Sequence, residues 1–388
     1  MNRYILKISI TTLLVLGLFT VFSNQKLIDK KLPSSLKTTV GQRWSVEKAN
    51  AWYSKHDWIV GCNYVPSNAI NQLEMWQKET FSPAMIDKEL GWAEEIGFNS
   101  MRVFLHYLPW KEDAEGFYER LDQFLEICDQ HHIAVMLIFF DDVWNPNPRS
   151  GLQPQPKKGI HNSGWVQCPG KNILENLDLY KSDLKKYVQQ TLKRYANDSR
   201  VLIWDLYNEP GNSNMSSYGK IEFRGKKKQS LILLKNVFSW AREIDLSQPI
   251  SSGIWNAGHA KIEKLNSFDQ FCYKNSDILN FHAYMGKTQT KKLIKVLKTN
   301  NRPLICTEYM ARTAGSTFEE ILPLLKKYNV GAYNWGFVAG KSNTIYPWES
   351  WKEPFKNEPE IWFHDILRQD GTPFSKDELQ FIKKTIQD

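Results

Sequence analysis

Two glutamates, Glu209 and Glu308, each stand at the end of a short apolar segment, where a carboxylate is expensive to bury unless it is used. Glu209 lies between Asn208 and Pro210, and Glu308 follows the run PLICT. A pair of facing carboxyl groups can hydrolyse a glycosidic bond, because one protonates the leaving oxygen while the other attacks the anomeric carbon or activates water. The two glutamates therefore predict cleavage of a carbohydrate.

Further polar and aromatic side chains stand at the ends of other apolar segments. They are Arg102, Asp141, Asp142, His282, Tyr284 and Trp335. Positive charge and donated hydrogen bonds favour the ionised form of a carboxyl group, so Arg102 and Tyr284 are suited to keep Glu308 charged. This interpretation leaves Glu209 as the acid, which later acts as the base.

These residues need a fold that brings the ends of many segments together. From residue 58 onward, eight short apolar runs of β type alternate with amphipathic helical segments, which is typical of parallel strands joined by crossover helices. Eight such strands close a (β/α)8 TIM barrel, an α/β fold whose active site lies at the C-terminal ends of the strands. The predicted strands are 58–64, 98–107, 133–140, 201–209, 249–255, 278–284, 303–309 and 331–337.

Side chains alternate between the two faces of a strand, which tells us which residues can meet. His282 and Tyr284 share one face of their segment, so both can point to the same cavity as Glu308. Asp205 shares a face with Glu209 and is expected deeper in the barrel as a hydrogen-bond partner.

Two long connections follow predicted strands, and both should lie at the mouth of the barrel, where long loops are usually functional. They run from Asp141 to about Lys171 and from Val338 to about Pro359. For their aromatic residues two interpretations stay open, stacking on sugars or packing of the loops. These residues are Trp144, His161, Trp165, Trp348 and Trp351.

Taken together, the strand-end residues resemble those of clan A glycoside hydrolases, and within them the cellulase and β-mannanase type family. The resemblance rests on the Asn-Glu-Pro of strand four, the Glu of strand seven, the His-x-Tyr of strand six, the Arg of strand two and the Trp of strand eight. It covers about residues 58–370. It implies a retaining double displacement, with Glu209 as acid/base, Glu308 as nucleophile and the carboxyl groups about 5–5.5 Å apart.

The resemblance also implies roles for the surrounding residues. Asn208 would hydrogen-bond the 2-hydroxyl of the sugar, and Arg102 would lie beneath the nucleophile. His282 and Tyr284 would position the two carboxylates. Trp335 would form the floor of the subsite where cleavage occurs.

The third strand departs from the family pattern, because it ends in Asp141-Asp142 where the family usually has a His. We expect Asp141 to hydrogen-bond a sugar hydroxyl, and we count Asp142 and Trp144 as further substrate contacts. The alternative for the two aspartates is that they cap or brace a loop. The departure bears on which sugar is bound more than on the reaction.

The composition fits a globular, carbohydrate-binding enzyme. The 388 residues include 15 Trp and carry a net charge of +8. The densest basic run, Lys226–Lys228, has no interleaved aromatic residues, so we interpret it as solvated surface and expect no nucleic-acid partner. The five Cys are scattered without metal-ligand spacing, so no metal or cofactor is expected and their pairing stays open. We expect a monomer whose partner is the carbohydrate substrate.

The N-terminal residues have the layout of an export signal. Residues 1–7 are basic and 8–22 are uncharged and mostly apolar, with Ser23 at a plausible cleavage position. We therefore predict a signal peptide at 1–23, a polar linker at 24–43 and a single catalytic domain at 44–388. An uncleaved membrane anchor is the alternative for 1–23, and either form places the domain outside the cytoplasm, secreted, periplasmic or at the cell surface.

Two other classes of function stay open. A non-catalytic carbohydrate-binding barrel would be indicated by the loss of Glu209 or Glu308, and both are present. An aldolase or a phosphate-substrate enzyme would be indicated by a strand-end Lys or a Gly-rich phosphate loop, and neither is visible. The sequence names neither the sugar nor the choice between chain-internal and chain-end cleavage.

Overall fold

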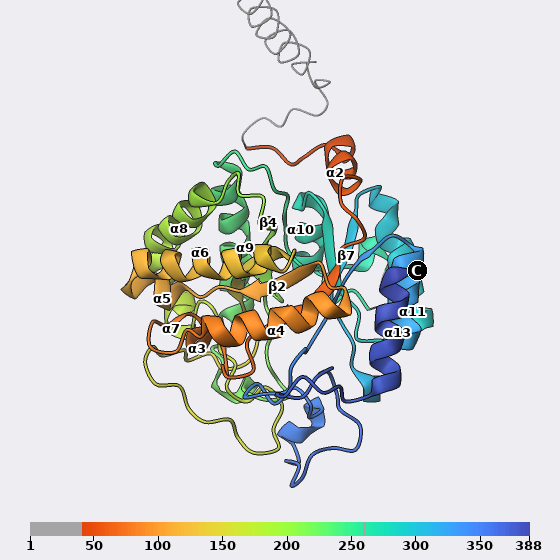
Figure 1. Cartoon of the computed structure of the whole chain (residues 1–388). Coiled ribbons are helices and arrows are strands. Elements are labelled where there is room, and N and C mark those ends of the chain that lie inside the picture. Colours follow the sequence, from red (N-terminus) through yellow and green to blue (C-terminus); the bar gives the residue numbers. More distant parts are fainter. Residues whose placement is uncertain (1–40, 259–260) are drawn as a thin grey trace, which may run out of the picture. The chain divides into compact units, whose positions relative to one another are not determined.

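The computed structural model describes residues 41–258 and 261–388, and it confirms the predicted barrel (Figure 1). Eight parallel strands lie in the order β5-β4-β3-β2-β1-β8-β7-β6. A parallel bridge between Ile254 and Phe281 joins the two edge strands and closes the ring. The strands are β1 (Val60–Tyr64), β2 (Ser100–Phe104), β3 (Ala134–Asp141), β4 (Val201–Asn208), β5 (Ile250–Ser251), β6 (Leu279–His282), β7 (Leu304–Tyr309) and β8 (Gly331–Asn334).

The fifth strand differs from its predicted span of 249–255, because the chain changes partner within it. Ile250 pairs with Trp204 of β4. Farther along the chain, the backbone N–H of Ile254 donates to Asn280 O of β6 at 2.8 Å. The same sequence segment therefore serves both sides of the seam, and only its first part is a regular strand.

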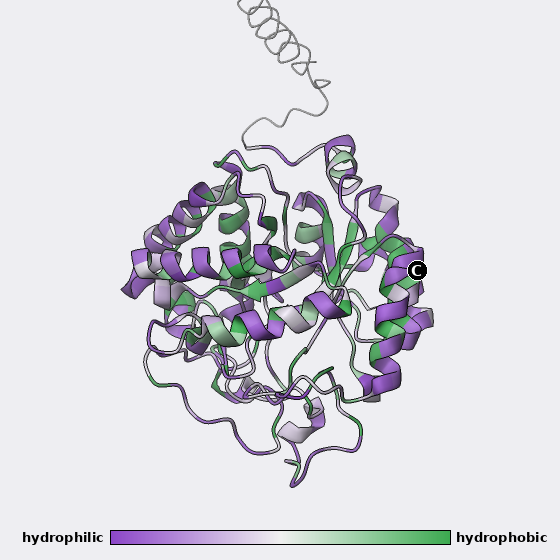
Figure 2. Cartoon of the chain, viewed as in Figure 1, coloured by the Kyte–Doolittle hydropathy of each residue, from purple (hydrophilic) through white to green (hydrophobic). Residues whose placement is uncertain are grey.

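The helices surround the barrel with their apolar faces inward and their hydrophilic faces outward (Figure 2). Pro83 occupies the first turn of α4, and Gly97 ends that helix in the left-handed region at φ 98°, which suits glycine. The α-helices are α2 (Val46–Tyr53), α3 (Gln72–Trp76), α4 (Pro83–Ile96), α5 (Tyr107–Glu112), α6 (Ala114–Gln130), α7 (Lys171–Glu175), α8 (Leu177–Arg194), α9 (Lys226–Arg242), α10 (Ser267–Asn275), α11 (Lys287–Leu297), α12 (Phe318–Lys327) and α13 (Lys376–Gln387). The 3₁₀ helices are η2 (Gly219–Ile221), η3 (Ile262–Lys264), η4 (Lys298–Asn300), η5 (Arg312–Ala314) and η6 (Trp348–Trp351).

The N-terminal end of the barrel is plugged by α2 and by Trp44, two residues before it. Trp44, Ala49 and Tyr53 join a buried cluster with residues near the beginnings of the strands. These strand residues are Ile59, Met136, Leu202, Ile203, Ile278, Ile305 and Tyr333. A dry, well-packed plug at this end leaves the opposite end as the place for a ligand.

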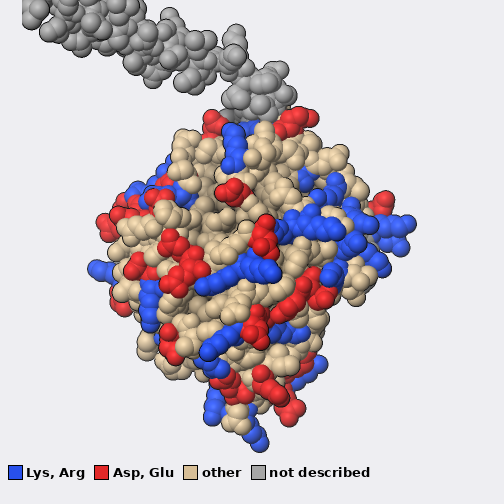
Figure 3. All heavy atoms as spheres, turned by 45° about the vertical axis from the view of Figure 1, so that its right-hand side comes forward, with Lys and Arg blue, Asp and Glu red and all other residues tan. Residues whose placement is uncertain are grey.

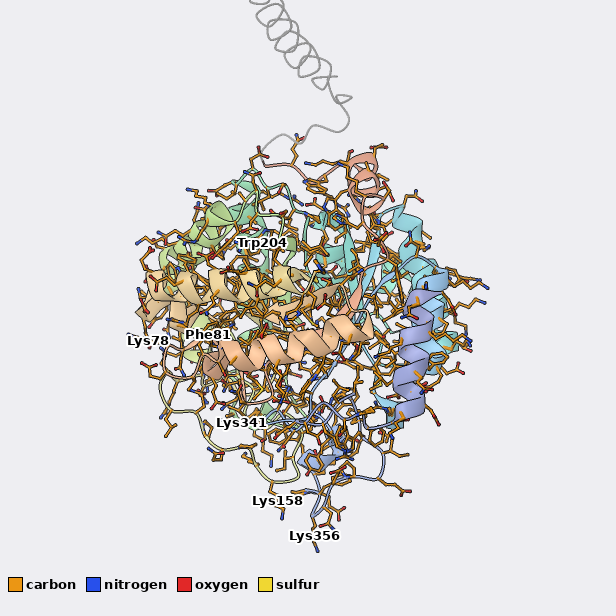
Figure 4. The ribbon with its side chains drawn as sticks, in the orientation of Figure 1. Lys78, Phe81, Lys158, Trp204, Lys341 and Lys356 are labelled. Carbon is orange, nitrogen blue, oxygen red and sulfur yellow. The ribbon has the colours of Figure 1, made fainter. Side chains whose placement is uncertain are left out.

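Three long loops gather at that opposite end, and we name each after the strand it follows. The β3 loop is residues 142–170, the β4 loop is 209–225 and the β8 loop is 335–375. Lys158 of the β3 loop and Lys356 of the β8 loop lie together at the end of the molecule opposite α2 (Figure 4). The two longest connections therefore reach the mouth of the barrel, as predicted.

Several predictions about charge and termini have structural outcomes. Charged residues of both signs are interspersed over the face in Figure 3. Lys226 is a correction, because it is buried and its ammonium donates to Glu222 Oε1 at 2.6 Å instead of being solvated. Arg43, which we placed in the linker, already binds the barrel through Ser276 O at 2.6 Å.

All five cysteines are buried and unpaired, which is the role of small core residues. The predicted signal peptide at 1–23 lies outside the described residues, as does the linker up to residue 40. Among the described helices, none combines the length and the apolar character that crossing a bilayer requires.

Candidate active site

Glu308 ends up beneath the mouth of the barrel, in a pocket of hydrogen-bond donors. Its Oε1 accepts from Arg102 Nη1 at 2.9 Å, and its Oε2 accepts from the Tyr284 hydroxyl at 2.9 Å. His282 Nδ1 lies 3.4 Å from the same Oε2. Burial raises the pKa of Glu308, whereas His282, Arg102 and Tyr284 act to lower it. The three neighbours thus oppose the effects of burial and of the nearby Glu209, and act to favour the ionised carboxylate.

Arg102 of β2 is fully buried and is held on every side. Its Nε and Nη2 donate to Asp205 Oδ2 at 3.1 and 2.8 Å, so Asp205 lies deeper in the barrel, as expected. Nη1 also donates to Asn63 Oδ1 at 2.7 Å, and Nη2 to Asn208 Oδ1 at 2.8 Å. A guanidinium with this many fixed acceptors holds one orientation, which fixes the carboxylate of Glu308 in turn.

Glu209 follows β4 in a different environment. Its Oε1 lies 2.9 Å from His282 Nδ1, and its Oε2 accepts from Asn212 Nδ2 at 2.7 Å. Burial raises the pKa of Glu209 to about 7, while the bond from Asn212 and the charge of Arg102 oppose the shift. A carboxyl group with this pKa is protonated for part of the time at neutral pH, which is what a general acid needs.

The two carboxyl groups face each other across a short gap. One carboxylate oxygen of Glu209, one of Glu308 and a ring nitrogen of His282 lie within 4.8 Å of one another. This separation agrees with the roughly 5–5.5 Å of retaining glycosidases and is shorter than the roughly 6.5–9.5 Å of inverting ones. A short distance of this kind suits direct attack of one carboxylate on an anomeric carbon.

The gap opens into a cavity of about 480 Å³ at the mouth of the barrel. Its wall includes most of the residues singled out from the sequence, namely Trp144, Asn208, Glu209, His282, Tyr284, Glu308 and Trp335. Arg102 lies behind Glu308 and does not reach the wall, as its predicted place beneath the nucleophile requires.

Asp141 and Asp142 are placed differently from our expectation of sugar contacts. Both are buried and neither lines the cavity. Asp141 accepts from Asn208 Nδ2 at 2.9 Å and from Trp165 Nε1 at 2.7 Å, whereas Asp142 accepts from the Tyr207 hydroxyl at 2.9 Å and from the backbone N–H of Gly211 at 2.6 Å. Their oxygens are occupied by protein donors, so they brace the residues around Glu209.

Replacing Asp141 with alanine should lower kcat/KM about 10-fold to 100-fold, because Asn208 loses its acceptor and can shift. The free energy of unfolding should also fall by about 1–3 kcal/mol, since buried donors are left without a partner. Steady-state kinetics and urea denaturation measure the two effects. Trp165→Phe removes one donor and keeps Asp141, so its effect on kcat/KM should be smaller. An unchanged kcat/KM in Asp141→Ala would contradict a positioning role.

Some residues of the site were not found from the sequence. Asn63 of β1 pairs in register with Arg102 and contacts it, but an isolated Asn in a strand carries no motif. Asn212 lies three residues after Glu209 and belongs to no motif that would have indicated its contact with that glutamate. His364 lines the cavity from beyond Pro359, where the predicted connection ended.

Strained backbone follows the C-terminal ends of three strands, β3, β4 and β7. Trp144, Glu209 and Met310 have φ values of 68°, 43° and 79°, in the left-handed region that non-glycine residues seldom adopt. Each lies one to three residues past the end of β3, β4 or β7. Strain of this kind persists where the surrounding structure enforces it, and it gathers at functional sites.

Among the described residues, Glu209, His282 and Glu308 form the one group whose side-chain atoms are close enough to surround a metal ion. The donors of this group are already engaged with one another, and Arg102 stands 2.9 Å from Glu308. A second positive charge at that carboxylate would be repelled, so the arrangement fits two catalytic carboxyl groups better than a cation site.

A (β/α)8 barrel with two facing carboxyl groups at its mouth is the arrangement that a glycoside hydrolase requires. Residues 65–340 match the model of the family described as Cellulase (glycosyl hydrolase family 5), and the chain belongs to that family. The resemblance seen in the sequence is therefore confirmed. No curated protein matches the chain.

Several solved structures share the fold at low sequence identity. A GH5_18 protein from Streptomyces cattleya in complex with GlcNAc is 13% identical, with a TM-score of 0.55 over 84% of this chain and 79% of that chain. The exo-β-1,4-mannosidase Op5Man5 from Opitutaceae bacterium strain TAV5 is 16% identical, with a TM-score of 0.54 over 85% and 59%. The endo-1,4-β-D-mannanase of Thermotoga petrophila RKU-1 is 14% identical, with a TM-score of 0.52 over 85% and 99%.

Proposed function

We propose that this enzyme cleaves β-linked oligo- or polysaccharides with retention of configuration. The observation that carries the proposal is the closeness of Glu209 and Glu308, which bring one carboxylate oxygen each to within 4.8 Å of the other in contrasting surroundings. Glu308, beside Arg102 and Tyr284, attacks the anomeric carbon. Glu209, with its raised pKa, donates a proton to the leaving oxygen.

In the second half of the reaction the roles reverse. Once Glu308 is esterified it no longer carries a negative charge, so the neighbouring Glu209 loses its proton more easily. Glu209 then removes a proton from water, which attacks the same face that the leaving group left. Both inversions together return the β-configuration.

Proton NMR of the first-formed product tests the proposal. Purified protein is offered β-1,4-mannan and β-1,4-glucan oligosaccharides together with Manβ1-4GlcNAc, the ligand of two further GH5_18 crystal structures. The β-anomer should appear first and then mutarotate. An α-anomer as the first product would contradict the double displacement.

Activity should fall as the pH rises through about 7, because Glu209 must be protonated to act as the acid. We expect kcat/KM for a substrate with a poor leaving group to decrease about tenfold per pH unit above that value. A dinitrophenyl glycoside, whose leaving group needs no proton, is the matched control and should lose this alkaline limb. An alkaline limb of equal size for both substrates would show that another group causes it.

We also propose that the enzyme works outside the cytoplasm, on the strength of the signal-like residues 1–23. The mass of the protein recovered from the producing cells tests this. Loss of about the first 23 residues indicates cleavage, whereas an intact chain in the membrane fraction indicates an anchor. Intact protein confined to the cytosol would contradict export.

A further inference from the structure

The β3 and β8 loops are joined into one wall of the cavity. The backbone N–H of Asn162 donates to Ser342 O at 2.9 Å, and that of His161 donates to Ser350 Oγ at 2.9 Å. The backbone N–H of Phe355 in the β8 loop also donates to Gly159 O in the β3 loop, at 3.0 Å. Loops tied at several points along their length close this side of the cavity.

The β4 loop extends the same wall. Trp144 N donates to Asn214 Oδ1 at 2.8 Å, and the Tyr218 hydroxyl donates to Ser163 O at 2.7 Å. The ring of Trp351 stacks on Trp144 with centroids 5.9 Å apart and meets Tyr218 edge-on at 4.9 Å. We call this continuous barrier of the β3, β4 and β8 loops the closed wall.

Two histidines of the closed wall line the cavity. His161 comes from the β3 loop and His364 from the β8 loop, and their ring centroids lie 5.3 Å apart. The ring of His364 is also 5.8 Å from that of Tyr284, whose hydroxyl contacts Glu308. The ring of Tyr284 therefore lies between His364 and Glu308, and His161 packs against His364.

The hydrogen bonds of these two histidines fix which ring nitrogen faces the substrate. His161 Nδ1 contacts Tyr346 O at 2.8 Å, and His364 Nδ1 contacts Met310 O. A carbonyl oxygen only accepts, so each Nδ1 carries the proton. Burial lowers the pKa of His161 to about 4 and that of His364 well below its usual value, so both rings are neutral. Each Nε2 is then a hydrogen-bond acceptor.

The side-chain hydrogen bonds of both rings are made through Nδ1, so within the described residues neither Nε2 has a protein partner, and both residues line the cavity. Binding cavities orient their ligands through a few such polar groups, so two acceptors without a protein partner on a cavity wall suit a ligand that brings hydroxyl donors. A sugar supplies such donors around its ring. The position of Glu209 fixes the direction of the sugar, because the leaving group must lie on the side of this acid.

Around Glu209 the cavity is bordered by Asn212 of the β4 loop and by Trp255 and Asn256, which follow β5. Within the described residues, no hydrogen bond or ring contact joins Trp255 or Asn256 to the β3 or β8 loop. A sugar with its anomeric carbon between Glu209 and Glu308 therefore directs its far hydroxyls toward His161 and His364. In a chain-internal sugar one of these hydroxyls would be a linkage to the next unit, and the closed wall occupies the space of that unit.

We propose, building on the function proposed above, that this enzyme removes the terminal sugar from the non-reducing end of a β-linked chain. His161 and His364 accept hydrogen bonds from two hydroxyls of that terminal unit through Nε2. The pair thereby distinguishes a free chain end from a chain interior.

The first experiment compares free and blocked chain ends. The probes are β-1,4-mannotetraose and β-1,4-glucotetraose, each unmodified and with a methyl group on O4 of the non-reducing terminal sugar. We expect the monosaccharide as the first product and a loss of at least about 100-fold in kcat/KM on methylation. Disaccharide as the first product, or equal cleavage of the methylated probe, overturns chain-end action but leaves the glycosidase function intact. No cleavage of any β-glycoside would overturn both.

The second experiment tests the two acceptors. Asparagine at position 161 or 364 keeps a donor near Nδ1 for the backbone carbonyl and removes the acceptor at Nε2. We expect His364→Asn and His161→Asn each to lower kcat/KM about tenfold, mainly through KM. Removing the 4-hydroxyl from the terminal sugar should lower kcat/KM in the unmodified enzyme. The loss should be smaller in the variant whose missing Nε2 accepts from that hydroxyl, because the same hydrogen bond is already absent. The 3-deoxy and 6-deoxy sugars are tested in the same way. If the losses from substitution and from deoxygenation simply add for every probe in both variants, the assignment of His161 and His364 as hydroxyl acceptors is overturned.

His106 provides a matched control. It is as buried as the pair, burial lowers its pKa to about 4, and its Nε2 contacts Gln167 O at 3.1 Å, but it does not line the cavity. His106→Gln should leave kcat/KM for blocked and free chain ends in the same ratio as in the unmodified enzyme. If His106→Gln changes this ratio as much as His364→Asn does, a general disturbance of the packing at the barrel mouth, and not the lost acceptor, explains the effect.

Discussion

Replacing Glu308 with alanine should reduce turnover on the order of 10⁵-fold or more, the scale seen when a covalent nucleophile is removed. The fold should survive, because Glu308 lies at a cavity and its partner Arg102 keeps Asp205, Asn63 and Asn208 as acceptors. Single-turnover kinetics with a dinitrophenyl glycoside measure the loss, and circular dichroism checks the fold.

Azide provides a positive test of the same role. The small anion fits the space left by the carboxylate and attacks the anomeric carbon from the side of Glu308. Glu308→Ala should then regain activity and release an α-glycosyl azide, since only one inversion takes place. Near-normal turnover without azide, or a β-glycosyl azide from this variant, would remove Glu308 from the nucleophilic role.

Replacing Glu209 with alanine should have an effect that depends on the leaving group. For a natural glycoside the loss should be about 10²- to 10⁴-fold, the usual contribution of general acid–base catalysis. For a dinitrophenyl glycoside the first step needs no acid, so the glycosyl-enzyme should form quickly and then accumulate as a burst. Stopped-flow absorbance and mass spectrometry of the quenched protein measure both effects.

The azide product again distinguishes the two glutamates. In Glu209→Ala the anion reaches the face from which the leaving group departed and should yield a β-glycosyl azide. Asn212→Ala is a suitable comparison, because it removes the hydrogen bond to Glu209 Oε2 but keeps the carboxyl group. That variant should raise the pKa of the alkaline limb, since the lost bond favoured the charged form. Equal losses for good and poor leaving groups in Glu209→Ala would contradict the acid/base role.

The sequence was sufficient to predict the barrel because its signals are local. Each strand is a short apolar run, and the alternation of side chains correctly placed His282, Tyr284 and Glu308 on one cavity. The ends of parallel strands meet at one mouth, so strand-end polar residues could be brought together without knowing any loop.

The details beyond the strands depended on contacts that have no local signal. Asp141 stands at a strand end just as Glu308 does, yet its oxygens are taken by Asn208 and Trp165, and only the folded loop reveals this. Lys226 belongs to a basic run but turns inward to Glu222. His364 reaches the cavity only because the β8 loop folds back over the mouth, which no periodicity predicts.

The left-handed backbone of Trp144, Glu209 and Met310 has a bearing on attempts to make this enzyme more heat-resistant. Each such residue costs about 1–3 kcal/mol. Glycine would relieve the penalty, but at positions 144 and 209 it would delete a side chain that lines the cavity. Engineering for higher melting temperature should therefore spare these three turns. It should concentrate on the outer helices and on the aromatic plug around Trp44, where better packing does not compete with turnover.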